Sequence, residues 1–255
     1  AAAGTTIVCV EQDRAVLDRC DRVVTLDAGR IVDAPTPRPR AAPVAWTVGS
    51  GRPGVSVAIV GLGHRYPGGL EALRDVTLEV GRGESVAIVG ANGSGKTTLA
   101  KHLVGLLRPS TGVVRFDGVA TEGRTVGELA QTVGFAFQDP GDQLFERSVA
   151  REGAFGPRQL GRSPSETSAA VEAALALTGL GSERDTNPYD LARPVRKLVT
   201  LAGVLAMDPA LLILDEPTTG QDPEGTERVG RVVEAMQGAG RTVIAITHDP
   251  AFAER

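Results

Sequence analysis

Short apolar runs separated by polar turns divide this chain into predicted strands and helices. Four of the runs are apolar throughout, which is typical of buried strands in a parallel sheet, and they lie near Val86, Val133, Leu211 and Val243. Two earlier β-rich runs, residues 55–60 and 76–80, alternate in polarity and indicate a smaller antiparallel β subdomain. The hydrophobic pattern therefore predicts an α/β fold with a parallel core sheet.

Helical patterns follow several of these strands. Residues 98–107 and residues 166–180 are amphipathic, and the second stretch is rich in alanine and leucine. The longest apolar run, residues 198–207, also reads as a helix, but it is far shorter than the roughly 18 residues that a membrane helix needs. Residues 1–10 lack the basic leader and cleavage pattern of a signal peptide. We therefore expect any membrane role to come through a partner.

The segment between the first core strand and its helix fits the pattern G-x-x-x-x-G-K-[ST] of a phosphate-binding loop. It consists of Gly90, Ala91, Asn92, Gly93, Ser94, Gly95, Lys96, Thr97 and Thr98. Its glycines let backbone N–H groups close around phosphates, and the helix N-terminus adds partial positive charge. Lys96 would supply a full charge and Thr97 a hydroxyl for Mg²⁺. The flanking strand and helix favour this interpretation over an ordinary glycine-rich turn.

Two carboxylates end the apolar run at residues 211–216. Asp215 is a candidate to hold Mg²⁺, and Glu216 is a candidate general base for the attacking water. A buried strand that meets a solvated acidic turn is common, so this run alone would not indicate catalysis. Its place downstream of a phosphate loop, followed by residues 217–222 (Pro-Thr-Thr-Gly-Gln-Asp), favours a catalytic site.

With these two motifs the chain resembles an ATP-binding cassette protein, a P-loop ATPase with a helical subdomain that residues 166–180 would occupy. The resemblance implies roles for further residues. Tyr66 would stack on adenine, and Gln138 would touch Mg²⁺ and sense a transmembrane partner. The D-loop would be residues 220–222, and His248 would contact the γ-phosphate. Tyr66 could instead be a surface tyrosine and His248 the cap of a strand, but their order and spacing favour the family roles.

Residues 138–145 and 154–157 also resemble a particular subfamily, the energy-coupling factor ATPases, which drive importers of vitamins and metal ions. This chain and the subfamily share a glutamine, a proline, an acidic residue, a Gln-Leu-Phe run and a later Phe-Gly-Pro. The physical alternative is a polar turn followed by a short amphipathic helix.

One family motif is missing. The signature loop, normally Ser-Gly-Gly-Gln at a helix start, should fall between Asp190 and Leu198. Ala192 lacks the usual hydroxyl, and Arg193 and Pro194 replace the glycine pair that permits close backbone approach. Arg193 or Arg196 could supply charge to a phosphate instead, and the sequence leaves this open.

Composition limits the class of protein. The 255 residues include 42% hydrophobic and 23% charged residues, as in ordinary globular proteins. A net charge of −4 argues against non-specific nucleic-acid binding, so no nucleic-acid partner is expected. Cys9 and Cys20 lack the spacing of a metal or redox motif. We expect the protein to lie at the cytoplasmic face of a membrane, to which a partner attaches it.

The start of the chain repeats its end. Residues 3–19 align without gaps on residues 239–255, with identity at six positions, and a repeat at one domain length indicates tandem cassettes. We therefore predict that residues 1–33 are the end of a first cassette, residues 34–54 a proline-rich linker, and residues 55–255 a second cassette without its C-terminal end. In this alignment Gln12 of the first cassette stands at the position of His248 in the second. Because only one of the two cassettes has this histidine, we also expect one degenerate ATP site and one hydrolytic site.

The function predicted from the sequence is ATP hydrolysis with Mg²⁺ that powers an energy-coupling factor importer of a vitamin or metal ion. Its partners would be an integral membrane subunit and another cassette, in the same chain or a second one. Two alternatives remain open: a soluble tandem cassette protein without a transporter, and a regulatory cassette that binds ATP with little hydrolysis.

Overall fold

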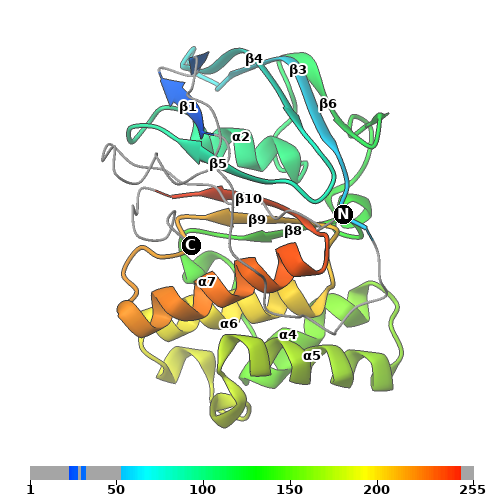
Figure 1. The fold of residues 1–255 in the computed structure, drawn as a ribbon, viewed down its shortest axis with the longest axis vertical. Helices are drawn as coiled ribbons and strands as arrows, with labels where there is room; N and C mark the ends of the chain where they lie inside the picture. The colour runs from blue at the N-terminus through cyan, green and yellow to red at the C-terminus, as the bar shows by residue number, and fades with distance from the viewer. Residues whose placement is uncertain (1–22, 28–29, 33–52, 248–255) are drawn as a thin grey trace.

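The computed structural model describes residues 23–27, 30–32 and 53–247, which form two sheets and a layer of helices (Figure 1). The larger sheet has the strand order β2 (Arg30–Val32), β1 (Val23–Asp27), β5 (Ser85–Val89), β10 (Thr242–Ile246), β9 (Leu211–Asp215) and β8 (Val133–Ala136). Every neighbouring pair from β1 to β8 is parallel, and β2 is antiparallel to β1. The predicted parallel core sheet is confirmed, and its carboxyl ends meet at one edge.

The second sheet is antiparallel, as predicted. Its order is β4 (Glu71–Val80), β3 (Val57–Arg65), β6 (Thr111–Phe116) and β7 (Val119–Ala120). The strand expected at residues 76–80 begins earlier, at Glu71, because it pairs with β3 as far as Arg65.

The described helices are α2 (Lys96–Leu103), α3 (Val126–Leu129), α4 (Val149–Gln159), α5 (Pro164–Thr178), α6 (Arg193–Ala206) and α7 (Pro223–Gly238), with 3₁₀ turns at Pro140–Asp142, Gly181–Glu183 and Pro188–Asp190. The helix expected at 166–180 is α5, which starts at a capping box of Ser163 and Glu166 and stops at the left-handed Gly179. Helix α6 starts five residues before the predicted 198, because a proline in the first helical turn loses no hydrogen bond.

The large sheet separates two apolar cores (Figure 1). On one face, α2 lies between this sheet and the antiparallel sheet, and on the other face lie α4, α5, α6 and α7. Strand β9 serves both cores: Leu211 and Ile213 point to the first, and Leu212 and Leu214 to the second. A strand that is buried on both faces reads as a continuous apolar run, which is why the sequence revealed it.

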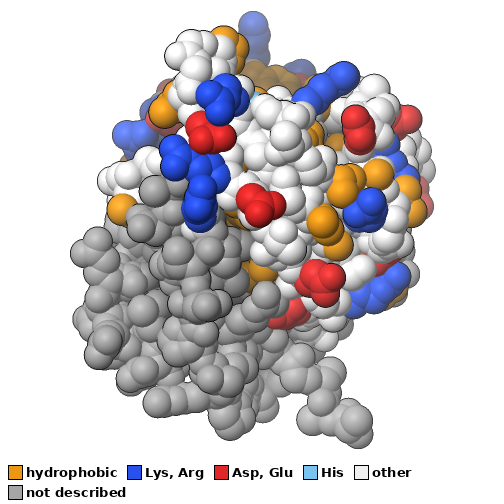
Figure 2. Space-filling model, turned by 90° about the horizontal axis from the view of Figure 1, so that it is seen from above, with side chains coloured by type: hydrophobic (Ala, Val, Ile, Leu, Met, Phe, Trp, Pro, Cys, Tyr) orange, Lys and Arg blue, Asp and Glu red, His pale blue; other side chains and the backbone are white. Residues whose placement is uncertain are grey.

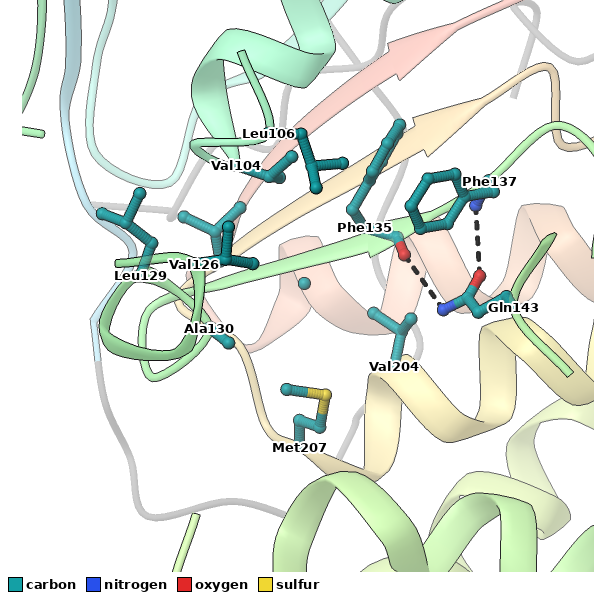
Figure 3. A pocket seen from close by; sticks show the side chains of 12 residues that line it. Val104, Leu106, Val126, Leu129, Ala130, Phe135, Phe137, Gln143, Val204 and Met207 are labelled. Atoms are coloured by element: carbon teal, nitrogen blue, oxygen red, sulfur yellow. Dashed lines mark hydrogen bonds between the residues drawn. The ribbon is translucent and has the colours of Figure 1, made fainter. Parts of the chain in front are cut away.

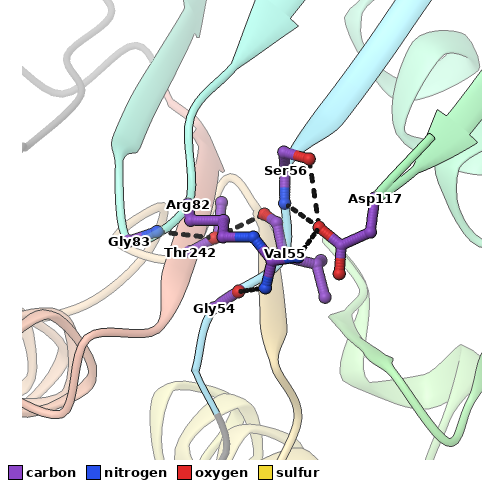
Figure 4. A network of polar contacts seen from close by, with 7 residues as sticks. All are labelled: Gly54, Val55, Ser56, Arg82, Gly83, Asp117 and Thr242. Atoms are coloured by element: carbon purple, nitrogen blue, oxygen red, sulfur yellow. Dashed lines mark hydrogen bonds and ion pairs between the residues drawn. The ribbon is translucent and has the colours of Figure 1, made fainter.

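A polar network joins the two sheets at the amino end of β10 (Figure 4). The buried hydroxyl of Thr242 donates to the carbonyl oxygen of Val55 at 2.7 Å and accepts from the amide of Gly83 at 3.0 Å. The Arg82 guanidinium contacts Asp117 at 3.0 Å. Gly54, the last residue of the predicted linker, donates to the carbonyl oxygen of Gly240 at 2.9 Å. These contacts fix the antiparallel sheet on the core at the edge opposite the carboxyl ends of the strands.

Positive and negative side chains are interspersed on the described part of the face seen from above (Figure 2). On the antiparallel sheet, the Glu71 carboxylate contacts Arg65 at 3.2 Å and Arg74 at 2.8 Å. Exposed pairs of this kind contribute little to stability, about 0–1 kcal/mol. The face shown carries no single-sign patch among its described residues.

Strands β1 and β2 come from the segment predicted to end a first cassette. In this structure β1 pairs with β5, so both strands belong to the same sheet as the phosphate-loop strand. The division into residues 1–33, 34–54 and 55–255 stays a prediction, since residues 1–22 and 33–52 lie outside the described residues. The helices in the described part of the chain include none with the length and hydropathy of a membrane span.

Two histidines lie in contact beneath the antiparallel sheet. The rings of His64 and His102 are 4.7 Å apart, and His102 on α2 is buried, with 2% of its surface exposed. Burial is the larger cause and the neighbouring His64 the second cause that together lower the pKa of His102 to about 4. His102 therefore stays uncharged at neutral pH.

This burial predicts an acid-sensitive stability. Between about pH 6.5 and about pH 4 the unfolded chain takes up a proton at His102 that the folded chain does not, so the free energy of unfolding falls as the pH falls. The full effect is on the order of 3 kcal/mol. We expect His102→Phe, which keeps a ring but cannot titrate, to flatten this part of the stability-against-pH curve. Parallel curves for the two proteins, measured by urea unfolding, would contradict the assignment.

Candidate functional site

The phosphate loop connects β5 to α2 through left-handed glycines. Gly90, Gly93 and Gly95 have φ angles of 155°, 82° and 101°. A Cβ atom at Gly95 would lie 2.5 Å from the carbonyl oxygen of Ala72 on β4, so only glycine fits there. At Gly93 a Cβ atom would meet no atom within 4 Å. The loop is thus packed against the protein on one side and open on the other, where a ligand can approach the backbone.

Lys96 closes over this loop. Its ammonium group donates to the carbonyl oxygens of Gly90 at 2.6 Å and Ala91 at 3.0 Å, at the place where phosphate oxygens are expected to bind. Burial lowers the pKa of Lys96, and the charges of Glu216 and Asp215 oppose that shift. The lysine and the two carboxylates are therefore near enough to interact electrostatically.

Asp215 ends β9 beside the phosphate loop. In the parallel register, Ile246 of β10 pairs with Asp215 on one side and with Ile88 of β5 on the other. Burial raises the pKa of Asp215, and a hydrogen bond from Thr97 is the largest opposing influence. The sequence-predicted pair of Thr97 and Asp215 is thus brought together.

Two buried polar atoms of the site have no hydrogen-bond partner in the structure, the Asp215 Oδ1 and the Ser94 hydroxyl. Buried polar atoms are nearly always paired, so each indicates a group that binds there. A carboxylate oxygen and a threonine hydroxyl suit Mg²⁺, whereas a serine hydroxyl and left-handed backbone amides suit phosphate. The residues present therefore fit a magnesium–nucleotide complex.

Glu216 follows β9 in an unusual conformation. Its φ angle of 49° is rare for a residue with a side chain, and its amide donates to the carbonyl oxygen of Ile246 at 2.6 Å. The Thr219 hydroxyl donates to its carboxylate at 3.4 Å. Strained backbone of this kind is common at active sites, where the surrounding structure enforces it.

The remaining predicted contacts are placed as follows. The Tyr66 hydroxyl lies 3.1 Å from that of Thr98 in the phosphate loop, and its ring meets the ring of His64 edge-on at 4.6 Å. Asn92 is exposed on the phosphate loop. Gln138 is exposed after β8 and lines a cavity of about 150 Å³ with Arg193, Pro194, Lys197, Thr219 and Gly220. Its contact with Mg²⁺ stays a prediction, while His248 and Gln12 lie outside the described residues.

The structure separates the two arginines of the altered signature segment. Arg196 donates to the carbonyl oxygens of Leu191 at 2.8 Å and Tyr189 at 2.5 Å, and its guanidinium lies 5.2 Å from the Tyr189 ring centre. Arg193 is exposed and contacts Asp139 at 2.7 Å. Ala192, the residue before α6, provides no side-chain cap. Arg196 is thus tied to its own segment, and Arg193 is the arginine with an exposed charge.

Sequence reasoning assigned no role to Lys197, yet this residue contacts the catalytic segment. Its ammonium group donates to the carbonyl oxygens of Glu216 and Thr219, both at 2.8 Å. Burial lowers its pKa, and the charge of Glu216 is the main opposing influence. The available signal was a lysine at the start of the apolar helical run, in a position that an apolar residue would usually take.

The Gln-Leu-Phe run has a structural explanation. The Gln143 amide bonds the main chain of β8 and its continuation, at Phe135 (3.2 Å) and Phe137 (3.3 Å), and Leu144 is buried. Phe145 is 57% exposed and meets Phe155 of the Phe-Gly-Pro segment edge-on at 4.7 Å. The motif therefore braces the end of β8 and presents an aromatic pair on the surface.

An apolar groove of about 170 Å³ lies next to this brace (Figure 3). The end of α2, helix α3, strand β8 and helix α6 contribute its side chains, among them Val104, Leu106, Val126, Leu129, Phe135, Phe137, Val204 and Met207. Leu106 and Val126 at its rim are 44% and 45% exposed.

Comparison with known proteins gives a consistent result. The family model described as "ABC transporter" matches residues 73–219. The cobalt import ATP-binding protein CbiO of Rhodobacter capsulatus is 42% identical over 76% of this chain and 70% of its own. The energy-coupling factor transporter ATP-binding protein EcfA of Methanothermobacter thermautotrophicus is 40% identical over 76% and 64%.

A solved structure agrees with these relatives. CbiO1 of Clostridium perfringens, part of the ABC transporter complex cbiONQ, is 37% identical over 76% of this chain and 78% of its own, with a TM-score of 0.68. The chain spans 34% to 76% of the length of the curated relatives it matches. One relative matches 97% of this chain, and that match covers 52% of the relative. Together with the phosphate loop and the two-sheet fold, these matches show that the chain belongs to the ABC transporter family and contains its ATP-binding cassette, a P-loop NTPase fold.

Proposed function

We propose that this chain hydrolyses ATP and thereby powers an energy-coupling factor importer of a vitamin or a metal ion. One observation carries the proposal: Lys96 and Thr97 of the phosphate loop interact with Asp215 and Glu216 at the end of β9. A binding loop alone would indicate a nucleotide, whereas carboxylates beside the phosphate position are what hydrolysis requires.

In this proposal each site residue has its own role. Lys96 and the amides of the loop bind and orient the phosphates, and Tyr66 offers its ring to adenine. Thr97 and Asp215 hold Mg²⁺, joined by Gln138, and His248 contacts the γ-phosphate. When bound there, Mg²⁺ would neutralise charge on the phosphate oxygens. Glu216 takes a proton from water as general base, and its carboxylate is oriented by Thr219.

The membrane partner is proposed from the groove in Figure 3 and from the named relatives. An apolar groove beside the segment that carries Gln138 and Gln143 suits an amphipathic helix, which inserts apolar anchors at helical spacing. We propose that an integral membrane subunit supplies this helix, that the chain lies on the cytoplasmic face of the membrane, and that a second cassette pairs with it.

A second candidate is a regulatory cassette that binds ATP with little hydrolysis. The altered signature segment supports it, because Ala192 offers no hydroxyl and the exposed charge of Arg193 is engaged by Asp139. A turnover assay on the purified protein separates the two functions. Recovery of the protein without any integral membrane subunit would favour the third possibility, a soluble tandem cassette.

The first prediction concerns binding. Lys96→Ala removes a charge-assisted phosphate contact, which contributes about 1.5–3 kcal/mol, so ATP affinity should fall at least about tenfold. Arg158→Ala, which removes an exposed cation in the last turn of α4, on the other face of the large sheet, is the control. Titration calorimetry with ATP and Mg²⁺ measures both, and an unchanged affinity in Lys96→Ala would rule out the phosphate role.

The second prediction concerns chemistry. Glu216→Gln keeps the size of the side chain and removes the base, so turnover should fall at least about a hundredfold while ATP still binds. Phosphate release under saturating ATP measures the rate. Wild-type turnover in this variant would mean that Glu216 has a structural role only.

The third prediction concerns the partner. Leu106→Asp and Val126→Asp place a charge at the rim of the groove and should reduce co-purification with an integral membrane subunit, while ATP affinity stays unchanged. Val119→Asp is the control, since Val119 is 51% exposed on β7 outside the groove. Equal recovery of the membrane subunit by all three variants would place its docking site elsewhere.

A further inference from the structure

Lys197 lies in the second turn of α6 and is almost fully buried, with 9% of its surface exposed. A buried ammonium group is costly unless its hydrogen bonds are satisfied. The partners it has are two main-chain oxygens of one short segment, those of Glu216 and Thr219. The ammonium group of Lys197 thus binds the turn that carries the proposed general base.

That turn is held from both sides. The Glu216 amide is bound by the end of β10 through Ile246 at 2.6 Å, and its carbonyl oxygen is bound by Lys197 at 2.8 Å. Between these two contacts the residue has the left-handed φ angle of 49°. Because the backbone conformation at Glu216 fixes its Cα–Cβ direction and restricts its rotamers, the two contacts together limit where the carboxylate can lie.

Thr219 extends the same arrangement. Its carbonyl oxygen is the second acceptor of Lys197, its amide donates to the Glu216 carbonyl oxygen at 3.3 Å, and its hydroxyl donates to the Glu216 carboxylate at 3.4 Å. Gln221 adds a further tie to α6 by donating to the Pro194 carbonyl oxygen at 2.8 Å. The first turns of α6 therefore hold residues 216–221 on the side opposite β10.

We propose that Lys197 is a positioning residue for ATP hydrolysis: it fixes the main chain of Glu216 and Thr219 and thereby orients the Glu216 carboxylate. This inference rests on the proposed function, in which Glu216 is the general base. It assigns to a lysine of the altered signature helix a role within its own cassette, in support of the adjacent carboxylate.

The experiment compares four variants of the protein, Lys197→Met, Lys197→Arg, Glu216→Gln and the double variant Lys197→Met/Glu216→Gln. Single-turnover hydrolysis, ATP affinity and the melting temperature are measured for each. Lys197→Met keeps the length of the side chain and removes its donors, and it should lower the hydrolysis rate about 10- to 100-fold because a displaced group loses its geometry. ATP affinity should stay within about threefold, because the phosphate loop is untouched. Lys197→Arg, which still donates, should recover part of the rate.

The double variant separates positioning from an independent role. If Lys197 acts through Glu216, the double variant should hydrolyse ATP as slowly as Glu216→Gln and no slower. A multiplied loss would overturn the proposal, as would a wild-type rate in Lys197→Met. If Glu216→Gln itself hydrolysed ATP at the wild-type rate, the proposed function would fail first, and that result is distinct from the other two.

A matched control tests for mere destabilisation. Arg162 also donates to two carbonyl oxygens, those of Ala206 at 3.3 Å and Met207 at 2.6 Å, but at the opposite end of α6. Arg162→Met should lower the melting temperature and leave the hydrolysis rate within about twofold. If Lys197→Met does not fold, Lys197→Gln replaces it with the same expectations. Equal rate losses in the Arg162 and Lys197 variants would overturn the positioning role.

Discussion

The parallel register of β5, β10 and β9 is the constraint on which the site depends. Ile246 pairs with both Ile88 and Asp215, so the strand that leads into the phosphate loop and the strand that carries the carboxylates end at the same level. A parallel sheet places these carboxyl ends at one edge, where a ligand can reach both. Residues more than a hundred positions apart in sequence thereby share one site.

Much of this arrangement could be predicted from the sequence because its signals are local or carry a fixed pattern. The phosphate loop is recognisable from glycines that its backbone requires. At Gly95, for example, the backbone lies so close to Ala72 that no Cβ atom would fit. Strands β5, β8, β9 and β10 are buried on both faces and so read as unbroken apolar runs. Two of the four antiparallel strands, β3 and β4, were indicated by their alternation, although β4 proved longer than its run; β6 and β7 were not predicted.

What could not be predicted depends on contacts between distant segments. The role of Lys197 is visible only once α6 is packed against the turn after β9, since its place in an apolar helical run does not show which carbonyl oxygens it contacts. The different surroundings of the two arginines could not be predicted for the same reason: Arg196 bonds carbonyl oxygens of its own segment, whereas Arg193 contacts Asp139. The left-handed conformation of Glu216 likewise follows from its surroundings and not from its residue type.

The division of β9 between two cores also bears on how this protein can change during evolution. Its alternate side chains belong to different cores, and its last residue is a site carboxylate. A single inserted or deleted residue would turn the side chains on one side of the change to the wrong face, or move Asp215 away from the phosphate loop. Exchanges between similar apolar residues would do neither. The length of this strand is therefore far less free to vary than its sequence, and family members should differ in its residues while keeping their number.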